Sequence, residues 1–271
     1  MTKTNSPNIK MQREFFQPAV LFLVISCSVV GAISSCFAEE ESVFASGEDR
    51  VKLIELYTSE GCSSCPPADF WLNKLIDNEK LWTRFVPLSF HVDYWDYLGW
   101  KDRFSRAEFS QRQRRYNSLG QAQGVYTPGM FLNGLEWRNW RNINTDDLAN
   151  DTEDSKTGNL KLRYSAKTIN VEFTPTSEQK IDRVYIALLG FELASSIKSG
   201  ENKGRNFTHN FVVLELLTSD PQFQQGKYSA NFNTFEPKLN EQSYAIAAWV
   251  THEDDSKPLQ STGGWLPNND K

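Results

Sequence analysis

The sequence predicts an α/β fold with an appended antiparallel β-rich C-terminal module. An apolar run at residues 51–57, a helical pattern that begins at Pro66 and a second apolar run at residues 85–92 form a strand–helix–strand unit, whose two strands lie parallel. In the second half of the chain the pattern changes to short alternating strands separated by turn-rich stretches. We therefore expect an α/β domain over residues 50–150 and a β-sandwich-like module over residues 158–271.

Local signals mark the elements of the α/β domain. Pro66 suits the first turn of a helix, where a missing N–H costs nothing, and apolar residues continue at helical spacing through Ile76. A second helix is expected from Ser105, which would be its N-cap, to Leu119. Asn133-Gly134 predicts a hairpin turn.

Beyond this hairpin, the polar residues 135–157 predict a terminal helix followed by a linker. Apolar alternation then predicts the strands of the C-terminal module, each bounded by turn residues. These strands are expected at residues 159–165, 168–173, 183–189, 211–218, 227–232 and 244–251.

Residues 1–38 have the pattern of a secretory signal peptide. Lys3, Lys10 and Arg13 precede an apolar stretch at residues 19–33, and the small residues that end at Ala38 resemble a cleavage site. The apolar stretch is shorter than a typical membrane span. The pattern predicts an exported protein, periplasmic or secreted.

A bacterial lipobox is the alternative for this region, because residues 33–36 resemble one and Cys36 would then be acylated as the mature N-terminus. Plain cleavage near Ala38 is the first expectation, and both routes place the folded part outside the cytoplasm. The acidic and polar residues 39–49 are expected to form a disordered lead-in.

The charge balance argues against a nucleic-acid binder, because the formal net charge is −5. The basic cluster of Arg112, Arg114 and Arg115 is small, and we expect it to be the solvated face of a helix. A hydrophobic content of 39% is enough for a substantial core.

Cys62 and Cys65 form the most informative motif, between the first predicted strand and the first predicted helix. A cysteine there faces unsatisfied backbone N–H groups and the positive end of the helix dipole. Both favour the thiolate, which is the attacking species in disulfide exchange. We assign Cys62, expected to be the more exposed, as the attacking thiol and Cys65 as the resolving thiol.

Cysteine usage favours a redox role. Cys27 and Cys36 lie in the predicted signal, so only the Cys62–Cys65 pair remains after plain cleavage. A lone pair in an exported protein forms a disulfide by default, but this bridge closes a very small loop and stabilises the fold little. A structural disulfide and a metal site stay open as alternatives.

Four neighbours of the pair are candidate accessory residues. Ser63 and Ser64 would donate hydrogen bonds to a Cys62 thiolate, which would make the oxidised form a better oxidant. A carboxylate of Glu60 or Asp69 would oppose thiolate formation if close to Cys62, and would assist exchange if placed to relay a proton to the resolving thiol. Surface or helix-start acids are an equally good interpretation of both.

The segment after the second strand adds polar and aromatic candidates at a position where ligands bind in open α/β sheets. His91, Asp93 and Asp96 would supply a base or, together with the cysteines, ligands for zinc or copper. A structural, hydrogen-bonded His91 is the alternative. The aromatic residues clustered here, which would either pack internally or line a peptide- or ligand-facing groove, are Tyr94, Trp95, Tyr97 and Trp100.

Two motifs together resemble the thioredoxin fold: a Cys-x-x-Cys that opens a helix, and Thr127-Pro128 leading into a strand. In that superfamily the proline is cis and packs beside the cysteines, so the resemblance implies these roles for Thr127 and Pro128. It covers about residues 50–145. Gly61 and the Ser63-Ser64 spacer depart from ordinary thioredoxins, which leaves substrate and redox direction open.

Three longer strings resemble a narrower family. Residues 55–69, 89–102 and 124–128 are similar to the secreted family catalogued as domain of unknown function 1223 (DUF1223). The resemblance implies a thioredoxin-like fold in an exported bacterial protein, without an established activity.

We therefore expect an exported thiol–disulfide oxidoreductase that uses Cys62 and Cys65. The pair is itself the redox group, so no cofactor is expected. The expected partners are protein or small-molecule thiols of the cell envelope and a redox partner, with membrane contact only if Cys36 is lipidated. The alternatives are a zinc- or copper-binding envelope protein and a non-enzymatic binding module with a structural disulfide.

Overall fold

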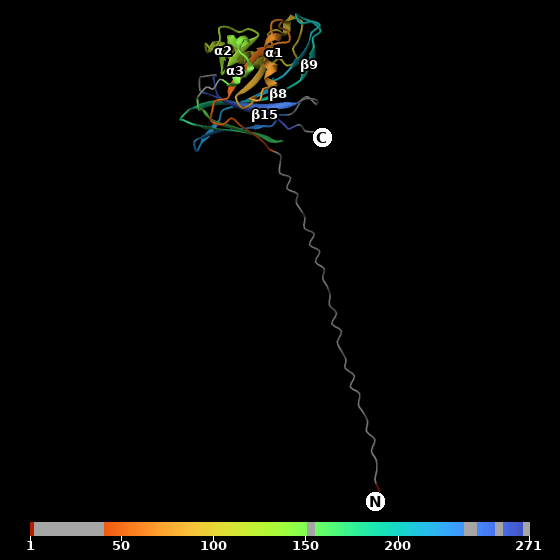
Figure 1. Cartoon of the computed structure of the whole chain (residues 1–271), viewed down its shortest axis with the longest axis vertical. Helices are drawn as coiled ribbons and strands as arrows, with labels where there is room; N and C mark the ends of the chain where they lie inside the picture. The colour runs from red at the N-terminus through yellow and green to blue at the C-terminus, as the bar shows by residue number, and fades with distance from the viewer. Residues whose placement is uncertain (3–40, 151–154, 236–242, 253–256, 268–271) are drawn as a thin grey trace. The chain divides into compact units, whose positions relative to one another are not determined.

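The structure is a computed structural model that describes residues 1–2, 41–150, 155–235, 243–252 and 257–267 (Figure 1). The chain divides into a unit of residues 1–38 and a unit of residues 39–271, and all helices and strands named below belong to the second. Most of the predicted signal peptide, including Cys27 and Cys36, lies outside the described residues. In the part of the chain that is described, no helix is long and apolar enough to cross a membrane.

The largest sheet is mixed. Its strands are β2 (Lys52–Thr58), β3 (Phe85–His91), β4 (Gly129–Leu132), β5 (Leu135–Glu136), β8 (Ile181–Gly190), β11 (Val212–Ser219), β14 (Tyr244–His252) and β15 (Pro258–Trp265). Their order in this 8-stranded sheet is β15-β14-β8-β11-β3-β2-β4-β5. β3 runs parallel to both β2 and β11, whereas the other neighbours are antiparallel.

Two further sheets are antiparallel. The 5-stranded sheet has the order β1-β6-β7-β13-β12, and β9 and β10 form a 2-stranded hairpin. The bounds are β1 (Ser42–Ala45), β6 (Gly158–Tyr164), β7 (Thr168–Pro175), β9 (Leu193–Ser196), β10 (Asn206–His209), β12 (Gln222–Gln224) and β13 (Lys227–Asn233). All six strands predicted for the C-terminal part are present, whereas β1, β9, β10, β12 and β15 are not predicted by the sequence.

Short helices connect the strands of the N-terminal half, and Figure 1 shows the three α-helices gathered on one side, above β8 and β15. The predicted strand–helix–strand unit is confirmed by β2, the first helix and β3. The helices are α1 (Pro66–Asn73), α2 (Ala107–Ser118) and α3 (Thr145–Asn150), with the 3₁₀ helices η1 (Lys74–Asp77), η2 (Asp96–Leu98) and η3 (Arg138–Asn142).

Alternate residues of a strand point to opposite faces of its sheet. Both faces of β8 and β14 pack against other parts of the protein. Ala187 and Ala247 pack in the cluster shared with β2, β3, α1 and α2, whereas Ile186 and Ile246 pack against the five-stranded sheet. The predicted boundary near residue 150 therefore does not separate two sheets, since strands from both sides of it build the eight-stranded sheet.

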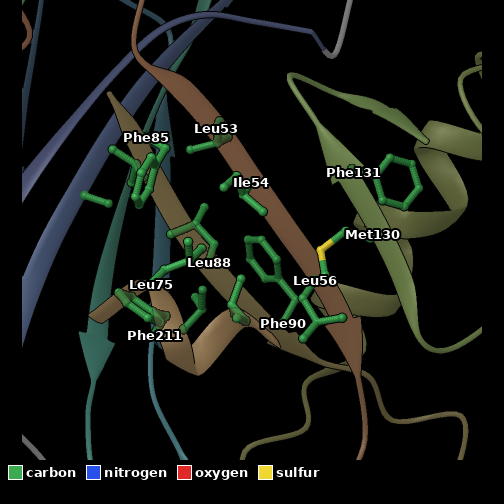
Figure 2. Packing of buried hydrophobic residues seen from close by; sticks show 14 of the residues in the cluster. Leu53, Ile54, Leu56, Leu75, Phe85, Leu88, Phe90, Met130, Phe131 and Phe211 are labelled. Atoms are coloured by element: carbon green, nitrogen blue, oxygen red, sulfur yellow. The ribbon is translucent and has the colours of Figure 1, made fainter. Parts of the chain in front are cut away.

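The side chains of β2, β3 and β4 form a buried core. Every residue of β2 and of β3 is buried. The predicted hairpin turn follows β4, where Asn133 and Gly134 have φ values of 50° and 79°, as a type I′ turn requires. Figure 2 shows part of this core, including Leu53, Ile54, Leu56, Phe85, Leu88, Phe90, Met130 and Phe131.

Two local predictions are wrong. The expected disordered lead-in contains β1, which pairs with β6 and packs Phe44 against the second core cluster. Ser105 does not cap the second helix, because α2 begins at Ala107 with Arg106 as its N-cap. The Ser105 hydroxyl instead donates a hydrogen bond to Asp96 Oδ2 at 2.8 Å.

Arg112 is not part of a solvated helix face, which corrects the interpretation of the basic cluster. Its side chain is 9% exposed, and its Nη2 lies 2.7 Å from Oε1 of the fully buried Glu55. The guanidinium also stacks 4.9 Å from the Tyr185 ring centroid and 5.2 Å from that of Trp249. Burial alone would lower the pKa of Arg112, but Glu55 and the nearby tyrosines together outweigh it and raise the pKa.

Candidate functional site

Three segments of the chain meet at one edge of the eight-stranded sheet. In the parallel pair of β2 and β3, Thr58 lies opposite His91, so the loops that follow both strands leave the sheet together. β4 is antiparallel to β2 and begins opposite Tyr57, so the residues just before Gly129 lie at this edge too. This arrangement brings together the loop between β2 and α1 (residues 59–65), which we call the cysteine loop, the segment after His91 and Thr127-Pro128.

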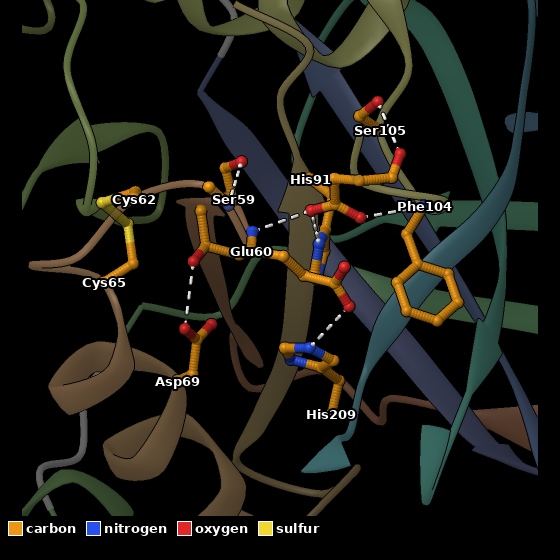
Figure 3. A network of polar contacts seen from close by, with 12 residues as sticks. Ser59, Glu60, Cys62, Cys65, Asp69, His91, Phe104, Ser105 and His209 are labelled. Carbon is orange, nitrogen blue, oxygen red and sulfur yellow. Dashed lines mark hydrogen bonds and ion pairs between the residues drawn. A yellow bond between two sulfur atoms is a disulfide. The ribbon is translucent and has the colours of Figure 1, made fainter. Parts of the chain in front are cut away.

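Cys62 and Cys65 form a disulfide at the start of α1 (Figure 3). Cys65 is the N-cap of α1, and its carbonyl accepts hydrogen bonds from the backbone N–H groups of Ala68 and Asp69. Cys62 lies one turn earlier, and its carbonyl accepts a hydrogen bond from Cys65 N at 3.3 Å. The position of the pair at the amino end of a helix is as the sequence predicts.

Both cysteines are 0% exposed, so the expectation that Cys62 is the more exposed is wrong. The turn between β9 and β10, residues 199–204, covers the backbone of the cysteine loop; we call it the cover loop. Asn202 Nδ2 donates hydrogen bonds to the carbonyls of Glu60 and Cys62, at 2.8 and 3.0 Å. Glu201 Oε2 accepts a hydrogen bond from Ser63 N at 3.2 Å.

The cover loop leads to a testable prediction. Asn202→Ala removes both hydrogen bonds to the cysteine loop. We therefore expect dithiothreitol to reduce the disulfide roughly tenfold faster, which corresponds to a loss of about 1.4 kcal/mol from the free energy that holds the cover loop in place. Asn206→Ala is the matched control, because Asn206 lies in the same hairpin and its side chain bonds Ser196 instead. Equal reduction rates in Asn202→Ala and the unchanged protein would show that the loop does not restrict access.

The serine spacer is the exposed part of the cysteine loop. Ser64 Oγ lies 3.4 Å from Cys62 Sγ, which is the contact expected for a hydroxyl that stabilises a Cys62 thiolate. Ser63 contributes its backbone N–H to Glu201.

Thr127-Pro128 is joined to the cysteine loop through Trp95. The Thr127–Pro128 peptide bond is cis. Trp95 Nε1 donates a hydrogen bond to Thr127 Oγ1 at 2.7 Å. On its other side, Trp95 packs so closely on Gly61 that a Cβ there would lie 3.2 Å from the tryptophan Cβ. Gly61 therefore allows Trp95 to lie between the cysteine loop and Thr127.

A buried polar network adjoins the cysteine loop (Figure 3). Asp102 Oδ2 lies 2.6 Å from His91 Nδ1 and accepts a hydrogen bond from Glu60 N at 2.9 Å. His209 Nε2 lies 3.2 Å from Glu60 Oε1, and Trp100 Nε1 donates to Glu60 Oε2 at 2.7 Å. The rings of His91 and His209 are in edge contact, with centroids 4.9 Å apart.

In this network, the effect of neighbouring charges and hydrogen bonds on the pKa values is larger than the effect of burial. Burial would lower the pKa of His91, but Asp102, Asp69 and Glu60 together outweigh it and raise the pKa. Burial would raise the pKa of Asp102, but His91 and the backbone N–H groups of Glu60 and Phe104 together hold it below its ordinary value. Burial would likewise raise the pKa of Glu60, whereas hydrogen bonds from His209, Ser195 and Trp100 lower it. Both directions favour the charged form of the buried His91–Asp102 pair.

Asp69 differs from the other two acids. It follows Cys65 by one helical turn, so the two side chains share a face of α1. Thr58 Oγ1 donates a hydrogen bond to its Oδ2 at 3.1 Å. Burial raises the pKa of Asp69, and the nearby His209 and His91 lower it by less. A carboxyl group with a raised pKa is suited to exchange protons with a thiol.

Asp93 and Asp96, which the sequence offered as bases or metal ligands, bond to serines instead. Ser110 Oγ donates to Asp93 Oδ1, and Ser105 Oγ donates to Asp96 Oδ2. Within the described ranges, no group of three or more His, Cys, Asp or Glu side chains is arranged to hold a metal ion.

Sequence reasoning missed three residues of the site: Asp102, His209 and Asn202. Asp102 lies within a family-like string, residues 89–102, and His209 is one of only 3 histidines in the chain. Asn202 lies in a turn-rich stretch that carries no chemical signal of its own. These residues lie near the cysteines because of the order of the strands in the sheet, and not because of their separation along the sequence.

Comparisons with known proteins agree with this geometry at the level of fold. A crystal structure of protein AGR_C_4864 from Agrobacterium tumefaciens is similar, with a TM-score of 0.57 and 24% identity over 83% of this chain and 98% of that chain. HBP35 of Porphyromonas gingivalis has a TM-score of 0.56 and 13% identity, over 83% of this chain and 79% of that chain. At these identities the likeness shows a shared fold alone. No curated protein matches the chain.

A family model matches residues 53–251, and its description is "Protein of unknown function (DUF1223)". The match extends over more than half of the chain and includes the cysteine loop, Thr127-Pro128, Asn202 and His209. The chain therefore belongs to the DUF1223 family, as the three strings in its sequence predicted.

Proposed function

We propose that this chain is an exported thiol–disulfide oxidoreductase with a thioredoxin-like site. The observation that supports this most directly is a Cys62–Cys65 disulfide at the N-terminus of α1, joined through Trp95 to a cis Thr127-Pro128. The helix N-terminus stabilises a thiolate at the pair. The location outside the cytoplasm and the envelope thiols as partners belong to the proposal and rest on the sequence of residues 1–38.

The reaction of the oxidised pair is a two-electron exchange. A substrate thiolate attacks Cys62 Sγ, the Cys62–Cys65 bond breaks, and Cys65 leaves as a thiolate. A second substrate thiolate then attacks the substrate sulfur of the mixed disulfide and releases Cys62. The substrate is oxidised to a disulfide, the pair is reduced to a dithiol, and the two protons of the substrate thiols pass to the two cysteines. The reverse sequence reduces a substrate disulfide.

Asp69 is the proposed proton donor and acceptor for Cys65. With its raised pKa, the protonated carboxyl gives its proton to the Cys65 thiolate as the disulfide opens, and takes it back as the disulfide closes. His209, His91 and Asp102 lie close enough to act electrostatically on this acid.

Asp69→Asn tests this role in two readouts that move in opposite directions. We expect slower exchange, by about 10²-fold, because general acid–base help is lost. We also expect higher stability at neutral pH, since an acid with a raised pKa destabilises the fold once pH exceeds its ordinary value of 3.8. The stability gain grows as pH rises through the raised pKa, and disappears below the ordinary value.

The control for this variant is Asp77→Asn, at an exposed acid in η1. It should change neither the exchange rate nor the pH dependence of urea unfolding. An Asp69→Asn protein that exchanges thiols at the unchanged rate would remove Asp69 from the mechanism.

Burial of both cysteines favours one alternative, a binding module whose disulfide is structural. Trapping distinguishes the two. Reduced Cys65→Ala is mixed with a short peptide disulfide, and mass spectrometry reports the adduct. Exchange predicts a stable mixed disulfide on Cys62, because the resolving thiol is absent. The Cys62→Ala protein is the control and should form no comparable adduct. If Cys65→Ala forms no adduct although its Cys62 is shown to be a free thiol, the result would favour the structural disulfide.

A further inference from the structure

A cleft of about 440 Å³ opens beside the disulfide. One wall contains Ser64, which contacts Cys62 Sγ, and another contains the cis Pro128. The third wall is the segment that contains η3, with Trp137, Arg138, Trp140 and Arg141. A molecule that reacts at the pair therefore has this cleft directly beside it.

The η3 wall is fixed to the helix that begins at the cysteines. Trp71 on α1 makes edge contacts with Trp137 and Trp140, with ring centroids 5.4 and 6.0 Å apart. Trp71 Nε1 also donates a hydrogen bond to the carbonyl of Ile143 at 3.2 Å. This packing sets the position of the two arginines relative to the disulfide.

The charge of the cleft is positive. None of its lining residues is acidic, whereas Arg138 and Arg141 are both exposed on it. Arg138 uses Nε to bond Glu136 at 2.9 Å, and that carboxylate also accepts bonds from Tyr126 OH and Gln123 N. The guanidinium has five donors, so most of those of Arg138 remain for a ligand.

The guanidinium carbon of Arg141 lies over the Trp140 ring, 4.2 Å from the ring centroid. Within the described ranges it has no carboxylate partner. An arginine held on an aromatic ring keeps its donors in a fixed plane, which suits the two oxygens of a carboxylate. The chain as a whole has a net charge of −5, so the positive charge of this cleft is opposite in sign to the net charge of the protein.

We propose that Arg138 and Arg141 make this cleft a binding site for carboxylates, so that the protein prefers substrate peptides with an acidic group within a few residues of the reacting cysteine. The proposal rests on the function proposed above and specifies its substrate class. The carboxylate comes from an aspartate or glutamate side chain or from a peptide C-terminus. The half-buried Trp137 and the exposed Tyr126 contact the apolar part of the same peptide.

The test compares exchange rates for peptide disulfides that differ only beside the cysteine. Reduced protein is mixed with peptides that carry glutamate, glutamine or lysine at that position, all with amidated C-termini. We expect the glutamate peptide to react roughly tenfold faster than the glutamine peptide, and the lysine peptide to be the slowest. A glutamine peptide with a free C-terminal carboxylate tests the second source.

Arg138→Gln/Arg141→Gln should remove the preference, so that the glutamate and glutamine peptides react at similar rates. Arg163→Gln/Arg183→Gln is the matched control, because it removes the same charge from exposed arginines outside the cleft. The preference should also shrink as salt is raised from about 0.05 to about 0.5 M. Equal rates for the glutamate and lysine peptides would overturn the carboxylate site and leave the exchange function standing.

A separate measurement keeps the two proposals distinguishable. Binding of the glutamate peptide with serine in place of cysteine is measured on the oxidised protein by calorimetry. Binding that Arg138→Gln/Arg141→Gln abolishes supports the carboxylate site even if no peptide exchanges thiols. No binding of this peptide, together with no charge preference in exchange, overturns it.

Discussion

Replacement of Cys62 by alanine is expected to lower the rate of the proposed thiol–disulfide exchange at least about 10³-fold, because it removes the sulfur that we propose as the attacking group. The fold should survive, since a bridge across two residues adds only about 2 kcal/mol in the loop-entropy account. The measurement is the rate at which reduced protein reduces a peptide disulfide, with urea unfolding as the check on folding.

Cys65→Ala is the matched variant for this prediction, because it removes the same disulfide and leaves Cys62. It should form the first mixed disulfide at close to the normal rate and then stop. Equal loss of the first step in both variants would contradict the assignment of Cys62 as the attacking thiol.

Arg112→Met is expected to destabilise the protein by about 3–5 kcal/mol, because it leaves the Glu55 carboxylate buried without its cation. Tyr116 OH remains as a partner of Glu55 and does not replace the lost charge. Unfolding in urea measures the change. Arg114→Met, at an exposed neighbour on the same helix, is the control and should change stability by less than about 1 kcal/mol.

The double variant Glu55→Gln/Arg112→Met separates pairing from packing. It should recover a large part of the lost stability, because no charge is then buried without a partner. A loss of under about 1 kcal/mol in Arg112→Met alone would show that the pair behaves as a surface ion pair does.

The sequence predicted the parts of the site that depend on local signals. Cys62 and Cys65 precede a helix that Pro66 begins, and both facts are visible within a few residues of sequence. The position of Thr127-Pro128 came from a resemblance, and the cis peptide and the bond from Trp95 agree with it.

Long-range contacts were out of reach of the same reasoning. Asn202 and His209 lie about 140 residues after the cysteine loop, and only the pairing of β11 with β3 and β8 brings the hairpin before it to this edge. The hydrogen bond from Asn202 to the Cys62 carbonyl comes from that hairpin and could not be read from residues 60–66. The eight-stranded sheet was missed for the same reason. The alternation of apolar and polar residues along a strand does not show which strands are its neighbours in a sheet.

Arg112 shows a different limit. A run of arginines on a helix is usually solvated, yet Arg112 lies three residues after Phe109 and four before Tyr116, on the apolar face. Helical spacing placed it inside, and only the presence of Glu55 on β2 makes that position tolerable.

The reduction potential of the Cys62–Cys65 pair tests the central claim most directly. The protein is equilibrated in glutathione and dithiothreitol buffers of known potential, and free thiols are alkylated and counted by mass spectrometry. The pair should titrate reversibly with a midpoint above about −270 mV, the value of thioredoxin, because Ser64 and the helix N-terminus favour the reduced form. A pair that stays oxidised below about −300 mV would be a structural disulfide, and the proposed function would be contradicted.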